Sequence, residues 1–136
     1  MKLFQAIETA ASGLTAERLR LDLIAGNIAN AQTTRTADGG PYRRKAAVFA
    51  AVLASAGRPG QGVRVSAIRE DDTAPRLEFD PQHPDANAEG YVAYPNVNVL
   101  QEMVDLITAA RAYEANVTVL NAGKGMFLKA LEIGRG

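Results

Sequence analysis

Apolar residues recur at two positions of every heptad over the first thirty residues of the chain. The members of this repeat are Leu3, Ile7, Ala10, Leu14, Leu21, Ile24, Ile28 and Ala31. Glu17 is the exception, because it occupies a position where the repeat would place an apolar residue. The pattern predicts a helix over about residues 3–30, roughly 42 Å long. A period of 3.5 residues keeps one stripe facing a partner, so this helix should supercoil against another helix.

A second stripe fills the last forty residues, where the spacing between its members alternates between four and three. The members are Val99, Met103, Leu106, Ala110, Tyr113, Val117, Leu120, Lys124, Phe127 and Leu131. All of them except Lys124 are apolar, and the spacing predicts a helix over about residues 98–133, roughly 50 Å long. Additional apolar residues widen the stripe: Leu100, Val104, Ile107 and Leu128. A stripe this wide is typical of a helix that touches more than one neighbour.

Glycines lie inside both predicted helices, at Gly13, Gly26, Gly123 and Gly125. Each interior glycine costs ~1 kcal/mol relative to alanine, which leaves the continuity of the last helix open. Two interpretations remain. The helices form an ordinary antiparallel pair with its own core, or they need the surface of partner molecules to stay ordered.

The middle of the chain differs from both ends, because all six prolines lie between residues 41 and 95. Proline breaks helix interiors, so this segment should form strands and turns. Strands are expected over residues 42–53, 63–67, 77–79 and 91–94, with a loop over 54–62. The predicted fold class is mainly α, with two long terminal helices and a small β region between them.

Charge and composition exclude several classes of protein. Fifteen Lys and Arg residues balance fifteen Asp and Glu residues, so the basic excess that a nucleic-acid-binding protein needs is missing. The chain has no cysteine, which excludes disulfides, thiol nucleophiles and cysteine-based zinc sites. No apolar run is long enough to predict a membrane span. The start of the sequence lacks the apolar region of a cleaved signal peptide, which by itself favours the cytoplasm.

Side chains suited to catalysis are sparse. His83, the single histidine, lies within residues 80–85 beside two prolines, which favour a solvated turn over a metal site. The adjacent carboxylates of residues 70–72 would point to opposite faces of a strand, so they cannot flank one scissile bond. Residues 43–45 form a short basic run whose plainest interpretation is an exposed strand end. The sequence therefore predicts no enzyme, no cofactor, no metal and no small-molecule substrate.

Two asparagines, Asn27 and Asn30, lie three residues apart near the end of the first predicted helix, so they share one face. Asparagine tolerates the left-handed conformation that ends helices, and its amide can bond free carbonyls or a neighbouring backbone. One interpretation is a local helix cap. The other is a joint at which the helix turns into the middle region against a partner.

Several runs of the sequence resemble the bacterial flagellar axial proteins, which include rod, hook and hook-associated components. Residues 27–33 look like their N-terminal motif, and 34–45 resemble the rod proteins of the proximal rod in particular. Residues 80–92 and 94–104 are similar to the central motifs, and 111–117 with 128–135 to the C-terminus. The positions that carry the first motif are Asn27, Ile28, Ala29, Asn30 and Thr33, and those that open the 94–104 run are Tyr94, Pro95 and Asn96.

The resemblance implies a structural subunit that self-assembles into the helical drive shaft of the flagellum. Residues 1–35 and 96–136 would form one discontinuous coiled-coil domain, and 36–95 a small β domain on the outside. The two apolar stripes would be the assembly seams. Expected partners are copies of itself, other proximal and distal rod proteins, and ring and export-gate components at the base. Family members leave the cell through the flagellar type III apparatus without a cleaved signal peptide, which revises the expected location to the basal body. The alternative is a soluble helical adaptor with a non-flagellar partner.

Overall fold

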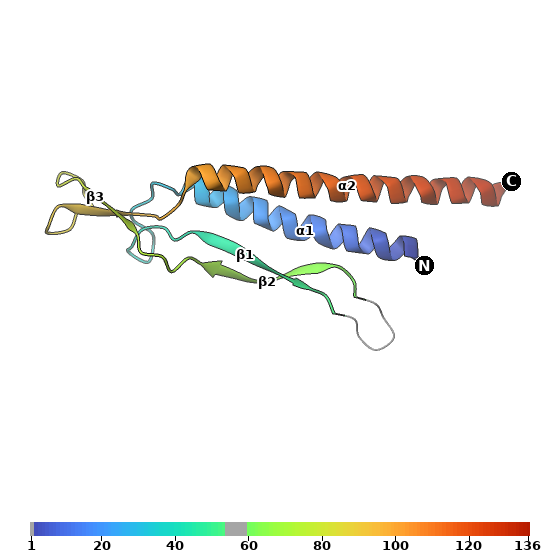
Figure 1. Cartoon of the computed structure of the whole chain (residues 1–136), viewed down its shortest axis with the longest axis horizontal. Coiled ribbons are helices and arrows are strands. Elements are labelled where there is room, and N and C mark those ends of the chain that lie inside the picture. Colours follow the sequence, from blue (N-terminus) through green and yellow to red (C-terminus); the bar gives the residue numbers. More distant parts are fainter. Residues whose placement is uncertain (1, 54–59) are drawn as a thin grey trace.

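The computed structural model describes residues 2–53 and 60–136, and two long helices dominate it. Helix α1 spans Lys2–Ala29 and helix α2 spans Val99–Arg135, and they lie side by side and antiparallel (Figure 1). Both predicted helices are confirmed, with ends within two residues of the expected ones. Helix α2 continues without a break through Gly123 and Gly125. Within the described residues, neither helix combines the length and apolarity that crossing a membrane requires.

Four short strands form two separate antiparallel hairpins, as the alternation of residues predicts. Strand β1 (Lys45–Ala51) pairs with β2 (Val63–Glu70), and β3 (Arg76–Phe79) pairs with β4 (Tyr91–Tyr94). The first strand is shorter than expected at both ends. Tyr42 donates its backbone N–H to the carbonyl of Thr33 over 3.1 Å, which holds residues before Lys45 in a loop. Of the predicted loop, residues 54–59 lie outside the described part of the chain.

Helix α1 lies between α2 and the β1–β2 hairpin, so the molecule has three layers where the hairpin runs along α1 (Figure 1). The hairpin rests on α1 near Ser12, whose Oγ accepts the backbone N–H of Val63 over 3.1 Å. Gly62 is required at this contact, because its φ is +91° and a Cβ there would lie 3.3 Å from the Cα of Thr9. The β3–β4 hairpin projects beyond the helix pair at one end of the molecule (Figure 1).

The core between these layers is built from small residues. Within the described part of the chain, the buried hydrophobic residues are Ala10, Ala16, Ile24, Ala31, Val92 and Ala109. The largest side chains that are fully buried include Glu102 and Asn27, which are polar. Alanine buries little apolar surface, so hydrophobic burial within one molecule contributes modestly to its stability.

Candidate functional site

Small residues bring the two helices into close contact. A Cβ on Gly123 would lie 2.9 Å from Cγ1 of Ile7, and a Cβ on Gly13 would lie 2.8 Å from the side-chain amide of Asn116. At the end of the helix pair where α1 begins, the rings of Phe4 and Phe127 meet edge to face, with 5.9 Å between their centroids. The side of α2 that contacts α1 therefore carries small or polar residues at the heptad position of Glu102, namely Glu102, Ala109, Asn116 and Gly123.

The predicted stripe of α2 is only partly covered. Its half-buried members are Val99, Leu106, Ala110, Tyr113, Val117 and Leu120, whereas Met103, Phe127 and Leu131 are 40–50% exposed. The N-terminal stripe is more uniform, because Ala10, Ile24 and Ala31 are buried and its other members are half-buried, these being Leu3, Ile7, Leu14, Leu21 and Ile28. The role of either stripe as an assembly seam stays a prediction.

At the opposite end of the helix pair, Asn27 ties three elements together although it has no exposed surface. Its Nδ2 donates to the carbonyl of Lys45 over 2.8 Å and to Oε2 of Glu102 over 3.2 Å. Its Oδ1 accepts the backbone N–H of Lys45 over 2.9 Å and the hydroxyl of Tyr42 over 2.8 Å. A single amide thus uses both of its polar atoms twice, joining α1 to the start of β1 and to the first turn of α2.

Glu102 carries the charge of this arrangement and is 1% exposed. Its second oxygen, Oε1, accepts Nε of Arg44, and the same guanidinium lies 3.8 Å from Oδ2 of Asp105. A buried carboxylate is costly unless it is paired and hydrogen-bonded, and here Arg44 and Asn27 supply both. We call Asn27, Tyr42, Arg44 and Glu102 the polar joint. The interpretation of residues 43–45 as an exposed strand end is wrong for Arg44, because that side chain turns inward to Glu102.

The surroundings of Tyr42 raise the pKa of its phenol. Burial raises the pKa of its phenol above 10.0, and the nearby carboxylates of Glu102 and Glu70 raise it further, while Arg44 acts in the opposite direction. The phenol therefore stays protonated and can donate to Asn27 over the whole physiological pH range.

The other asparagine of the motif has a local role. Asn30 Nδ2 donates to the carbonyl of Gly26 over 2.9 Å, and its Oδ1 accepts the hydroxyl of Thr33 over 3.1 Å. The carbonyl of Gly26 also accepts the backbone N–H of Asn30 over 3.0 Å, so the side chain adds a second bond within the end of α1. Ile28 is half-buried and Ala29 is exposed between the two asparagines. Asn30 bonds only within the end of α1, as a local cap would, whereas Asn27 joins α1 to the middle segment; the contact with a partner stays a prediction.

The loop after α1 is fastened to the turn that carries His83. Asp85 accepts the hydroxyl of Thr34 over 2.7 Å and lies 2.7 Å from a guanidinium nitrogen of Arg35. The turn over residues 80–85 is confirmed, but Asp85 is an anchor rather than a solvated side chain. His83 Nδ1 accepts the backbone N–H of Asp85. Within residues 2–53 and 60–136, no cluster of histidine and carboxylate side chains is placed to hold a metal ion.

The residues that open the 94–104 run lead into α2. Pro95 is fully buried, whereas Asn96 is exposed. The ring of Tyr94 lies between His83, 6.3 Å away by ring centroids, and the guanidinium of Arg76. This run therefore joins the projecting hairpin to the helix that carries Glu102.

Sequence reasoning missed Glu102, Arg44 and Tyr42 as members of the joint. One signal was available: an acidic residue at position 102 shares a heptad position with Ala109 and Gly123 instead of lying on the outer face. An isolated charge among small residues on a helix contact needs a partner of opposite sign, because a buried unpaired charge is costly. Residues 43–45 form a basic run in the middle segment that could have supplied this partner.

Comparison with known proteins identifies the family. A family model described as flagella basal body rod protein matches residues 7–35, and one described as flagellar basal body rod FlgEFG protein C-terminal matches 88–133. The flagellar basal-body rod protein FlgC of Borreliella burgdorferi is 48% identical over the full length of both chains. The chain belongs to the FlgC family of flagellar basal-body rod proteins. The FlgC proteins of Bacillus subtilis and Escherichia coli O6:H1 are 47% and 44% identical, over 99% of this chain and 100% of theirs.

The two matched segments contain both sides of the helix pair. Residues 7–35 include Asn27, Asn30 and Thr33, while 88–133 include Tyr94 and Glu102. Arg44 and Tyr42 lie between the matched segments, so the polar joint of this FlgC-family chain brings the helical ends and the middle segment together.

Proposed function

We propose that this protein is a structural subunit of the flagellar basal-body rod that self-assembles through its terminal helices into the drive shaft that transmits torque. Its neighbours are copies of itself, other proximal and distal rod proteins, and ring and export-gate components. The proposal includes no catalytic step. Family membership supports the rod subunit and gives no support to the alternative, a soluble adaptor.

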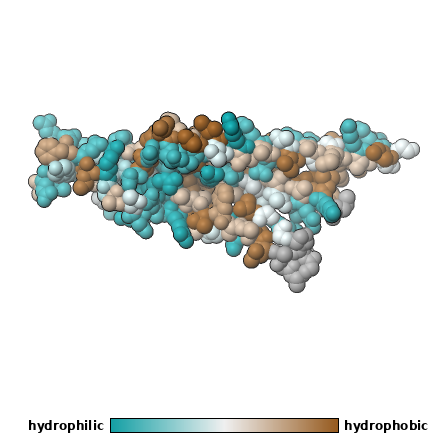
Figure 2. Space-filling model, viewed as in Figure 1, coloured by the Kyte–Doolittle hydropathy of each residue, from teal (hydrophilic) through white to brown (hydrophobic). Residues whose placement is uncertain are grey.

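The distribution of apolar side chains carries the proposal. Within the described residues, the buried hydrophobic side chains are mostly alanine, while larger ones along α2 remain exposed. The exposed set on α2 is Leu100, Met103, Val104, Ile107, Val119, Met126, Phe127, Leu128, Leu131 and Ile133. Figure 2 shows apolar atoms gathered over the start of this helix. Fully burying an exposed side chain of this size stabilises by about 1.5–3 kcal/mol, so covering these partly exposed residues with neighbouring subunits would favour assembly.

In this proposal residues 1–35 and 96–136 act as one discontinuous coiled-coil domain, and 36–95 lie outside it as a small β domain. The antiparallel packing of α1 and α2 and the projection of the β3–β4 hairpin support that division (Figure 1). The β1–β2 hairpin would line the helical part, since it rests on α1. The protein would reach the basal body through the flagellar type III apparatus without removal of a signal peptide.

The experiment compares Ile107→Asp with Thr108→Asp. Ile107 is 57% exposed on the outer face of α2, so the change leaves the folded monomer intact. If this face is buried in the rod, a carboxylate there costs several kcal/mol in every subunit. Thr108 is also exposed, but it is polar and is not a member of this apolar set.

We expect Ile107→Asp cells to make the protein at a normal level, to lack it in purified basal bodies and to fail to swim in soft agar. Thr108→Asp cells should swim. Circular dichroism of both purified variants controls for folding. Normal basal bodies in the Ile107→Asp strain would refute assembly through this face.

A further inference from the structure

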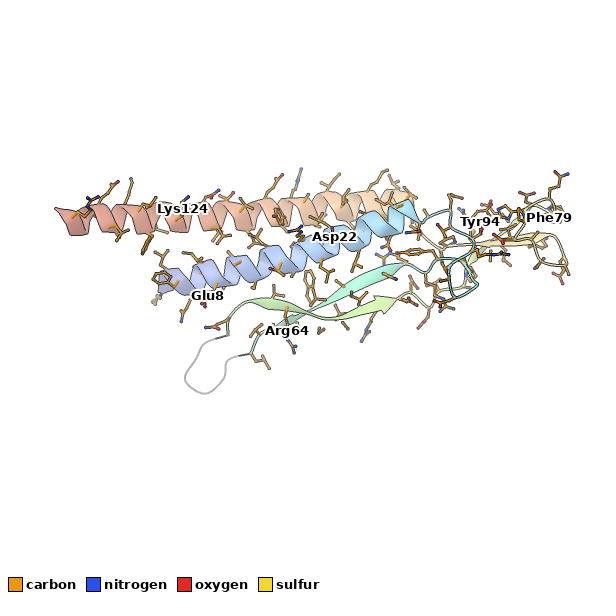
Figure 3. The ribbon with its side chains drawn as sticks, turned by 180° about the vertical axis from the view of Figure 1, so that it is seen from behind. Glu8, Asp22, Arg64, Phe79, Tyr94 and Lys124 are labelled. Carbon is orange, nitrogen blue, oxygen red and sulfur yellow. The ribbon has the colours of Figure 1, made fainter. Side chains whose placement is uncertain are left out.

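The projecting β3–β4 hairpin carries an exposed apolar patch at one end of the molecule. Leu77 and Phe79 lie on the same face of β3, and Tyr91 is the strand partner of Phe79. The rings of Phe79 and Tyr91 meet edge to face, with 5.3 Å between centroids. Phe79 is nevertheless 66% exposed. We call Leu77, Phe79 and Tyr91 the tip patch, and Figure 3 shows Phe79 at the extreme end of the molecule.

The Phe79 ring of the tip patch packs closely on Gly90, and the patch lies in acidic surroundings. Gly90 packs so closely on the Phe79 ring that a Cβ there would lie 2.9 Å from its Cε2. Residues 77–91 contain four carboxylates and no Lys or Arg. Two of these carboxylates have basic neighbours, Glu78 with Arg76 and Asp85 with Arg35. Asp80 and Glu89 supply the rest of the negative charge.

The other end of the molecule carries a second apolar patch with the opposite charge. Helix α2 extends beyond the start of α1, because Phe127 already lies beside Phe4 (Figure 1). The remaining turns expose Leu128, Leu131 and Ile133, which we call the tail patch. Residues 124–136 contain three basic side chains and one acidic one, Glu132. The tail patch is therefore apolar and basic where the tip patch is apolar and acidic.

We propose that the tip patch of one copy binds the tail patch of a second copy of this chain. Apolar surface meets apolar surface in this contact, and Glu89 and Asp80 approach Lys129 and Lys124. A contact of like with like at the tip would instead place Asp80 and Glu89 of one copy near the same carboxylates of the other. Because the two patches lie at opposite ends, the contact is heterologous and repeats as an open chain. The inference rests on the proposed self-assembly and adds the pair of surfaces that joins successive copies.

The absence of native cysteine allows a direct test by disulfide cross-linking. Purified Phe79→Cys and Leu131→Cys chains are mixed in equal amounts at high concentration and oxidised, and the products are identified by mass and peptide mapping. The matched control replaces Leu131→Cys with Val119→Cys, which is 46% exposed on α2 but outside the tail patch. The mixed Phe79–Leu131 product should exceed the Phe79–Val119 product at least tenfold, and the double variant Phe79→Cys/Leu131→Cys should form a ladder beyond dimers.

Charge reversal tests the electrostatic part of the contact. Glu89→Lys and Lys129→Glu should each lower the yield of the mixed product by about two- to fivefold, the size expected for an exposed ion pair, and combining them should restore it. Homodimers of each single variant without mixed product would overturn the proposal, as would a mixed product no stronger than the Val119→Cys control.

The same cysteine variants are then oxidised in cells, and basal bodies are purified. Variants present in basal bodies with Phe79 linked to Leu131 of another copy support the proposal. Variants present there with Phe79 linked only to a protein of different mass, or to nothing, overturn the tip-to-tail contact while the rod assignment stands. If the wild-type chain is itself missing from basal bodies, the proposed function fails instead.

Discussion

Replacing Asn27 by alanine should strongly lower the free energy of unfolding, although the substitution removes only one small side chain. The substitution removes four hydrogen bonds and leaves their partners facing a methyl group: both backbone groups of Lys45, the hydroxyl of Tyr42 and Oε2 of Glu102. Each lost bond of this kind costs about 1 kcal/mol, and more where the partner is charged and buried. Alanine recovers about 0.5 kcal/mol of helix propensity.

We therefore expect the free energy of unfolding to fall by about 3–4 kcal/mol in the Asn27→Ala variant. Domains of this size are stable by about 5–15 kcal/mol, so the loss is a large fraction of the total. The matched control is Asn30→Ala, since Asn30 lies one turn away and makes only local bonds to Gly26 and Thr33. That change should cost about 1 kcal/mol.

Urea denaturation followed by far-ultraviolet circular dichroism measures both variants against the wild-type chain. The Asn27→Ala midpoint should shift several times further than the Asn30→Ala midpoint, with the m-value unchanged if unfolding stays two-state. Equal shifts for the two variants would show that the polar joint does not hold the elements together, and the reasoning would be wrong.

Two further predictions concern the helix contact and the joint. Gly125→Ala should raise the free energy of unfolding by about 1 kcal/mol, because a Cβ at that position would have no atom outside its own helix turn within 4 Å. Gly123→Ala should lower the free energy of unfolding by up to about 2 kcal/mol, because its Cβ would overpack Ile7. Thermal melts of the two variants distinguish these outcomes. Since the folded state holds the Tyr42 proton more tightly than the unfolded chain, stability should fall as pH rises above about 10 and through the higher folded pKa. Titration of tyrosinate absorbance should show a late step that Tyr42→Phe removes.

Local patterns were enough to predict the elements of the fold. Helices need a long apolar period without proline, and strands need alternation between turn residues, and both signals lie within short windows of the chain. The start of β1 was misplaced because a tertiary bond, from the backbone N–H of Tyr42 to the carbonyl of Thr33, holds the preceding residues in a loop. Such a bond joins residues whose local sequence gives no sign of it.

The contact side of α2 was harder to predict, because a search for apolar residues finds large side chains first. The residues that meet α1 are small or polar, as Gly123 and Asn116 show. In α2, large apolar residues such as Ile107 lie instead on the outer face. If α2 assembles as proposed, its hydrophobic stripe indicates the surface for neighbours as much as the surface for its own partner helix.

The polar joint sets the register of the two helices, which the small residues of the helix contact do poorly. Small residues such as Ala109 and Gly123 permit close packing, but they discriminate poorly between registers of the two helices that differ by one heptad, because such a shift still finds small or polar side chains. Glu102 does discriminate, since any shift separates it from Asn27 and Arg44 and leaves a buried charge unpaired, at a cost of about 3–5 kcal/mol. The joint thus fixes the register inside one subunit, and under the proposed function the large apolar side chains of α2 are left for contacts between subunits.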